Sequence, residues 1–311
     1  MTLDFNTAAS LTLPTPHAAG CGCALHARRR FNAGLLGAGA VLAAPALARE
    51  GVEVGNQSSF TQFVSAEQVE AAALQQYAQM KQQAGQQKAL APDNHPQVIR
   101  LRAIAQRLIP FSYEWNPRAR DWKWEINLFG SKQVNAFCMP GGKIAFYYGI
   151  LDQLQLADDE VSMVMGHEMT HALREHAREQ MGKTLATRGA IELGAAIFGL
   201  GNAGRTVADM GGQLLTLRFG RADESEADLV GMELTARAGY DPHAGVTLWN
   251  KMAAASQGAP PQFMSTHPSG PTRIRDIEAS LPKVQGLYAR APKPTQRFEP
   301  PKPGSASSGD K

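Results

Sequence analysis

Along the chain, hydrophobic and polar residues alternate in one short region and recur at helical spacing on both sides of it. Residues 122–128 alternate strictly, which is typical of a strand with one buried face. Residues 134–139 and 143–148 are predicted to form two more strands, because the Pro-Gly-Gly sequence at 140–142 indicates a turn between them. The pattern therefore predicts a small antiparallel sheet.

Helices are predicted before and after this sheet. Ser65 and Gln68 resemble a capping box that opens an amphipathic helix, and Pro96 marks the start of a second helix. From Asp158 onward the pattern of the chain is mostly helical. The sequence therefore predicts an α+β fold that is mainly helical, with the small sheet between its helices.

The first 48 residues have the features of a secretory signal rather than of a folded element. Three arginines at 28–30 precede Phe31, a run of small apolar residues at 34–44 and an Ala-x-Ala sequence at 46–48. The arginines and the phenylalanine resemble a twin-arginine export signal. A membrane anchor is the alternative, but the apolar run is shorter than the roughly 20 residues that span a bilayer. We therefore expect residues 1–48 to be removed and the protein to be periplasmic.

Composition narrows the class of protein further. The chain has 311 residues, a net charge of +3 and three cysteines, and its length suffices for one large domain or two modest ones. Such a small charge does not indicate a nucleic-acid partner. Removal of the signal would leave Cys138 as the only cysteine, which excludes an internal disulfide. The apolar segment 190–201 is too short and too interrupted to span a membrane, so we expect no transmembrane helix in the mature protein.

The sharpest chemical signal is the sequence HEMTH at residues 167–171. Residues four apart lie on one face of a helix, so both imidazoles can bind one metal ion, and Glu168 can point at its open coordination position. The alternative is a surface helix with two hydrogen-bonded histidines. A metzincin would need glycine and histidine where this chain has Arg174 and Ala177, so that class of protease is excluded.

A second pair of candidate residues lies in a later helical stretch. Glu224 and Asp228 are four residues apart and share a helix face, so one can bind the metal while the other hydrogen-bonds a ligand histidine. The alternative is an ordinary charged helix face. His176 lies five residues beyond the second histidine of the motif and is expected to face solvent. Cys138 is interpreted as a small apolar filler, with a thiol near the site as the alternative.

Several short motifs accompany these two helices in a characteristic order. They are Asn135-Ala136-Phe137 followed by Pro140-Gly141-Gly142, then Gly239-Tyr240-Asp241-Pro242, then Ser265-Thr266-His267-Pro268 followed by Arg273-Ile274. Together with the HExxH and ExxAD patterns, they resemble the CAAX-prenyl-protease-like zinc metallopeptidases of the gluzincin type over residues 94–285. The resemblance implies a mainly helical zincin-type domain in which an edge strand of the small sheet borders the active site.

The resemblance also implies a metal site and a general base. His167, His171 and Glu224 would bind one Zn²⁺ ion per chain. Glu168 would act as the general base and later as the acid, and Asp228 would hold a ligand histidine in place. The segment before this domain, residues 49–93, is expected to be a helical lead-in. Residues 286–311 are rich in Pro, Ser and Gly, which predicts a disordered tail.

Two further residues, His267 and Arg273, each have two alternative roles. In periplasmic members of the family the histidine of the His-Pro motif can approach the zinc and keep the enzyme latent, so His267 would either do this or shape the rim of the cleft. Arg273 would either stabilise the oxyanion of the transition state or pair with a carboxylate. The substrate would add as a β-strand along Asn135, Ala136 and Phe137, where backbone pairing accepts many sequences.

These features predict an exported zinc metalloendopeptidase that acts on protein or peptide substrates. Family resemblance implies degradation of unfolded or misassembled envelope proteins, with the envelope assembly machinery as a partner. The periplasmic β-barrel-assembly-enhancing protease carries a helical repeat module for which the tail here is too short, so functions of that module are not expected. The alternatives are a non-proteolytic chaperone or binding protein with a zinc site, and a small-molecule metallohydrolase with a closed pocket.

Overall fold

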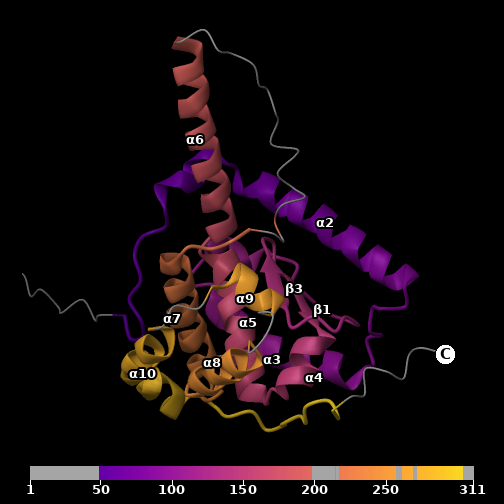
Figure 1. The fold of residues 1–311 in the computed structure, drawn as a ribbon. Helices are drawn as coiled ribbons and strands as arrows, with labels where there is room; N and C mark the ends of the chain where they lie inside the picture. The colour runs from indigo at the N-terminus through magenta and orange to yellow at the C-terminus, as the bar shows by residue number, and fades with distance from the viewer. Residues whose placement is uncertain (1–48, 198–213, 215–216, 257–260, 269–271, 304–311) are drawn as a thin grey trace, which may run out of the picture. The chain divides into compact units, whose positions relative to one another are not determined.

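The computed structural model describes residues 49–197, 214, 217–256, 261–268 and 272–303 (Figure 1). The chain divides into two compact units, residues 1–49 and 50–311, and the elements described below belong to the second unit. The predicted export signal at residues 1–48 lies outside the described residues.

A three-stranded sheet consists of β1 (Glu125–Phe129), β2 (Ala136–Met139) and β3 (Lys143–Tyr147), in the order β1-β3-β2. β2 and β3 are antiparallel, as the turn between them predicted, but β1 and β3 are parallel. The sheet is therefore mixed rather than wholly antiparallel. Alternation along a strand determines which face is buried but not which strand lies beside it. Here β3 takes the middle position and leaves β2 at an edge.

The other elements of the described ranges are helical, as the periodicity predicted. In chain order they are η1 (Ser59–Phe63), α2 (Ala66–Gln86), α3 (Pro96–Ser112), η2 (Pro117–Arg120), α4 (Tyr148–Leu154), α5 (Asp158–Leu173), α6 (His176–Ile197), α7 (Arg221–Arg237), α8 (Ala244–Ala255), α9 (Gln262–Thr266) and α10 (Arg273–Arg290). The side chain of Ser65 accepts a hydrogen bond from the backbone N–H of Gln68 and so caps the start of α2. Proline at the first position of α3 fits a helix start, where its missing N–H is not needed.

Helix α5 lies at the centre of the core, with the sheet on one side and α7 on the other (Figure 1). Every residue from Val161 to Leu173 is buried, so the alternative of a surface helix at the HEMTH motif is wrong. The crossing of α5 and α7 is close because two glycines meet there. A methyl group on Gly166 would lie 2.7 Å from the carbonyl oxygen of Gly231. This crossing brings the acidic residues of α7 beside the middle of α5.

The structure describes the C-terminal segment as far as residue 303. α10 continues to Arg290, and the extended residues 291–303 run back over α3 and the start of α5. There the side-chain amide of Gln97 donates to the carbonyl of Glu299, and the backbone N–H of Phe298 donates to Asp158 Oδ2 over 2.8 Å. Composition predicts a disordered tail from residue 286, and the described residues of this tail make these contacts with α3 and α5. Residues 304–311 lie outside the described part of the chain.

We find no bilayer-spanning candidate among the helices of the described ranges, since none combines sufficient length with a sufficiently apolar sequence. Much of the apolar segment 190–201 falls outside these ranges.

Candidate metal centre

Four side chains from three helical segments converge at one buried point. α5 supplies His167 and His171 one turn apart, α7 supplies Glu224, and His267 follows the last residue of α9. One nitrogen or oxygen atom from each lies within 4.8 Å of the other three, and each residue is only 3% exposed. Imidazole nitrogen and carboxylate oxygen are ligands that Zn²⁺ favours. The arrangement is therefore a candidate metal centre.

The distances between these atoms show which edge of each ring faces the others. His167 Nε2 lies 3.1 Å from His171 Nε2, and His171 Nε2 lies 3.5 Å from Glu224 Oε1. His267 points its Nδ1 at the same place, 3.0 Å from Glu224 Oε1 and 3.4 Å from His167 Nε2. The structure thus brings His267 into the cluster, and the same residue also lines the cleft beside it.

Glu168 provides an independent indication that this site fits a metal ion and its water. Glu168 is 2% exposed, and its Oε1 has no hydrogen-bond partner in the described structure. Burying an unpaired carboxylate oxygen is costly, so such an atom indicates a missing polar group. This oxygen lies 3.6 Å from His267 Nε2, at the edge of the cluster. The donor set and the unpartnered oxygen therefore fit a zinc ion with a water molecule.

The two glutamates of the site differ in their tendency to hold a proton. Burial raises the pKa of Glu168, and the imidazoles of His267 and His167 only partly offset this effect. Burial acts on Glu224 in the same direction, but its hydrogen bond with His267 and the neighbouring positive charges outweigh it and lower its pKa. Glu224 is therefore suited to bind a cation as a carboxylate, and Glu168 is suited to exchange a proton.

Asp228 orients the first histidine of the motif. His167 Nδ1 lies 3.0 Å from Asp228 Oδ1, so a proton on Nδ1 is donated to the carboxylate and Nε2 is left free toward the cluster. Burial opposes the charge on Asp228, but the Arg273 guanidinium lowers the pKa of this carboxyl. Of the two carboxylates that share a face of α7, Glu224 therefore lies in the cluster and Asp228 behind it.

The contacts of Arg273 distinguish between its two predicted roles. Its Nε donates to Asp228 Oδ2 over 2.6 Å and its Nη1 to Glu224 Oε2 over 2.8 Å. Its guanidinium also lies over the ring of Trp249, 3.5 Å from the centroid. Arg273 does not belong to the described lining of the cleft into which Glu168 opens. These contacts favour pairing with carboxylates over stabilisation of an oxyanion.

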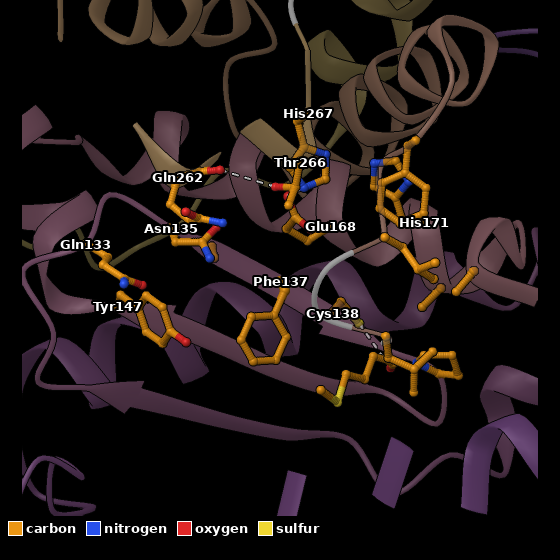
Figure 2. Close-up of a pocket in the computed structure, with 18 residues that line it drawn as sticks. Gln133, Asn135, Phe137, Cys138, Tyr147, Glu168, His171, Gln262, Thr266 and His267 are labelled. Atoms are coloured by element: carbon orange, nitrogen blue, oxygen red, sulfur yellow. Dashed lines mark hydrogen bonds and ion pairs between the residues drawn. The ribbon is translucent and has the colours of Figure 1, made fainter. Parts of the chain in front are cut away.

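A cleft runs along β2 and past the metal cluster, as Figure 2 shows. Asn135 and Phe137 line one wall, and Glu168 faces them beside His171 and His267. Ala136 also belongs to the lining. Apart from Glu168 and these two histidines, its described lining residues are uncharged at neutral pH. They are Gln133, Asn135, Ala136, Phe137, Cys138, Met139, Pro140, Tyr147, Ala172, Ala177, Leu214, Leu217, Phe219, Gln262 and Thr266.

Cys138 also belongs to this wall, but its thiol is not activated. The side chain is buried, and burial raises the pKa of the thiol well above its usual range. A thiol that stays protonated is a poor nucleophile and a poor metal ligand. The environment therefore agrees with the interpretation of Cys138 as a small apolar filler.

The prediction that His176 faces solvent is wrong, since it is only 1% exposed. Its Nδ1 lies 2.9 Å from His171 Nδ1. The prediction assumed one continuous helix, but α5 ends at Leu173 and Glu175 adopts a positive φ of 59° before α6 begins. This break turns the start of α6 back toward the cluster. Nothing in the pattern of residues marks it, because no glycine or proline occurs there.

Comparison with known proteins supports the same reading of the chain. The model of "Peptidase family M48" matches residues 95–281. The mitochondrial metalloendopeptidase OMA1 of Schizosaccharomyces pombe is 35% identical over 199 residues, which are 63% of this chain and 56% of that protein. The metalloprotease LoiP of Escherichia coli is 30% identical over 191 residues, 60% of this chain and 72% of LoiP. The beta-barrel assembly-enhancing protease of Escherichia coli is 27% identical over 176 residues, 53% of this chain and 36% of that protein.

Proposed function

The chain belongs to peptidase family M48, which confirms the resemblance seen in its motifs, and we propose that it is a zinc-dependent endopeptidase. One observation carries the proposal: the buried carboxylate of Glu168, whose Oε1 has no hydrogen-bond partner in the described structure, lies beside a His-His-Glu cluster and lines a cleft. A purely structural metal site has no need of such a group. The chain spans little more than half the length of the fission-yeast relative.

In this proposal His167, His171 and Glu224 hold the zinc ion. When bound, zinc supplies Lewis-acid chemistry and lowers the pKa of a coordinated water. Glu168 takes the proton from the attacking water and later gives it to the leaving amine. Its raised pKa supports the first step, because a carboxylate with a higher pKa takes up a proton more readily, and the carboxylic acid formed in this way is the donor for the second step. Asp228 keeps His167 in the tautomer that leaves Nε2 free.

His267 is proposed to be a fourth protein contact of the zinc in a resting state. Catalytic zinc sites keep one position open for water, whereas sites with four protein ligands are closed. The Nδ1 of His267 lies among the other three ligand atoms, and its Nε2 faces Glu168. A ring in this place competes with water for the metal and occupies the space in front of the base. Hydrolysis would then require His267 to withdraw.

The substrate is proposed to bind as an extended strand along Asn135, Ala136 and Phe137. β2 is an edge strand, so none of the described strands lies beside its outer backbone groups. A peptide added there gains main-chain hydrogen bonds that do not depend on its sequence. The largely uncharged cleft also gives no reason to select a charged side chain. Unfolded proteins, whose backbone is available for such pairing, are the class of substrate that fits best.

The proposed place of action is the bacterial envelope. The arginines and apolar run before residue 48 support export by the twin-arginine route. One relative is named for enhancing β-barrel assembly, which supports quality control of misassembled envelope proteins as the task and the assembly machinery as a partner. A non-proteolytic zinc-binding chaperone would bind the same unfolded chains without Glu168.

Cleavage of casein by the purified protein tests the endopeptidase proposal. Glu168→Gln removes the base but keeps size and polarity, so we expect the rate to fall at least about 100-fold while zinc stays bound. A zinc chelator should abolish cleavage by the wild type. Glu179→Gln, in an ion pair with Lys183 on α6, is the control and should cleave normally. Normal cleavage by Glu168→Gln, or by protein without metal, would contradict the proposal.

A further inference from the structure

Each ring of the HEMTH motif uses one nitrogen toward the cluster and turns the other toward a different partner. For His171, Nε2 faces the cluster and Nδ1 faces the Nδ1 of His176 over 2.9 Å. A neutral imidazole carries one proton, and a nitrogen that binds a metal must not carry it. The partner of Nδ1 therefore decides whether Nε2 of His171 is available.

His176 is held between His171 and a carboxylate on α7. Its Nε2 lies 3.3 Å from Glu226 Oε2, and the other oxygen of Glu226 accepts a hydrogen bond from Arg174 Nε. Glu226 is two residues from Glu224 and so lies on a different face of α7. The aromatic ring of Phe219 stacks on His171 and lies tilted beside His176. The ring of His176 is thus enclosed, and polar partners face both of its nitrogens.

The series of hydrogen bonds from His171 through His176 ends at Glu226, and this carboxylate determines the direction of the hydrogen bonds. An ionised carboxylate only accepts hydrogen bonds, so His176 must donate its Nε2 proton to Glu226. A neutral His176 then has a bare Nδ1, which accepts the Nδ1 proton of His171. As a consequence, His171 has a bare Nε2 that points into the cluster. The reverse direction would place a lone pair of His176 against the carboxylate.

From this geometry we propose that His176 is a positioning residue for the metal centre. Together with Glu226 and Arg174, it fixes the ring orientation and the tautomer of His171 so that Nε2 is ready to bind zinc. The inference rests on the proposed zinc function. Each histidine of the motif is then oriented by its own hydrogen-bond partners. Asp228 and Arg273 orient His167, and His176 with Glu226 orients His171. Both supports reach α5 from outside the cluster.

The test is the zinc affinity of the purified full chain, measured by competition with a chromophoric chelator. His176→Leu fills most of the space but cannot accept the hydrogen bond from His171 Nδ1, so we expect affinity to fall about 10- to 100-fold. His176→Asn places a carbonyl oxygen where Nδ1 lies and can accept from His171, so it should bind markedly more tightly than His176→Leu. Equal losses in both variants would mean that the ring only fills space and would overturn the proposal.

A second variant tests Glu226, at the other end of this series of hydrogen bonds, and leaves His176 unchanged. Glu226→Gln offers an amide N–H as well as an oxygen, which permits the reverse direction and a proton on His171 Nε2. We expect weaker zinc binding and an altered visible spectrum of the Co²⁺-substituted protein. Glu179→Gln is the matched control, because Glu179 lies on the same helix as His176 and pairs with Lys183.

Two results of these measurements would be distinguishable. Wild-type affinity and spectrum in Glu226→Gln would overturn the inference about His176 alone. A wild-type protein that binds no zinc would overturn the proposed function itself. Circular dichroism of the metal-free variants shows whether each has folded. If His176→Leu does not fold, the comparison of His176→Asn and Glu226→Gln with the wild type still decides the proposal.

Discussion

At the scale of single residues, the surroundings of Glu168, Glu224 and Asp228 determine which of these acidic side chains holds a proton more readily. Glu224 is paired with Arg273 and His267, and its pKa is lowered although burial opposes this. Asp228 is held by the same arginine behind His167. Glu168 has one oxygen without a partner, and burial raises its pKa. Two of these acids are therefore fixed as anions, and the third is able to exchange a proton.

His267 allows a prediction at the same scale. In His267→Ala the cluster keeps two histidines and Glu224, and the space before Glu168 becomes free for water. If the histidine closes the site, we expect the basal rate of casein cleavage to rise several-fold, with zinc still bound. His243→Ala removes an exposed histidine that pairs with Asp241 and serves as the control. An unchanged or lower rate in His267→Ala would count against a resting-state contact.

At the scale of elements, the site depends on how closely α5 and α7 approach each other. A methyl group on Gly231 would lie 2.7 Å from the backbone nitrogen of His167, closer than atoms can pack. The absence of a side chain here lets the carboxylates of α7 reach the histidines of α5. The spacing within each helix could be read from the sequence, but the distance between the helices depends on this contact.

Gly231→Ala should therefore push the two helices apart. We expect the free energy of unfolding to fall by about 1–3 kcal/mol, as for other overpacked cores, and zinc binding to weaken. Urea denaturation of the metal-free protein measures the first effect. Gly85→Ala, near the end of α2 with no atom within 4 Å, is the control and should be neutral or stabilising by up to about 1 kcal/mol. Equal stabilities of the two variants would contradict the importance of the close crossing.

The sequence predicts those parts of the site that depend on regular helices. The four-residue spacings place His167 with His171, and Glu224 with Asp228, and the structure has both pairs on one face. It does not predict the position of His176, because the positive φ of Glu175 redirects the chain at a residue without a distinctive side chain. Parallel pairing of β1 with β3 is likewise a contact between distant segments that alternation within a strand does not specify.

At the scale of the whole molecule, the C-terminal segment packs against α3 and the first residue of α5. The proline-rich composition of this segment predicts disorder. Asp158, at the first position of α5, nevertheless binds both this segment and α3. Asp158 Oδ1 accepts from Arg100 over 2.7 Å within a buried ion pair, and Oδ2 accepts from the backbone N–H of Phe298. Prolines remove backbone donors but do not prevent carbonyl groups and the remaining N–H groups from pairing. The segment therefore satisfies polar groups of α3 and α5.

A chain that ends at residue 291 tests this role. It loses the donor to Asp158 and the Arg297–Asp159 ion pair, so we expect the free energy of unfolding to fall by about 1–3 kcal/mol. A chain that ends at residue 303 keeps these contacts and is the control. The described residues of this segment contribute no side chain to the metal cluster, so both chains should bind zinc with wild-type affinity while they are folded. Equal urea midpoints for the two chains would show that the segment adds no stability, and a loss of zinc affinity in the shorter chain would show that its effect reaches the metal centre.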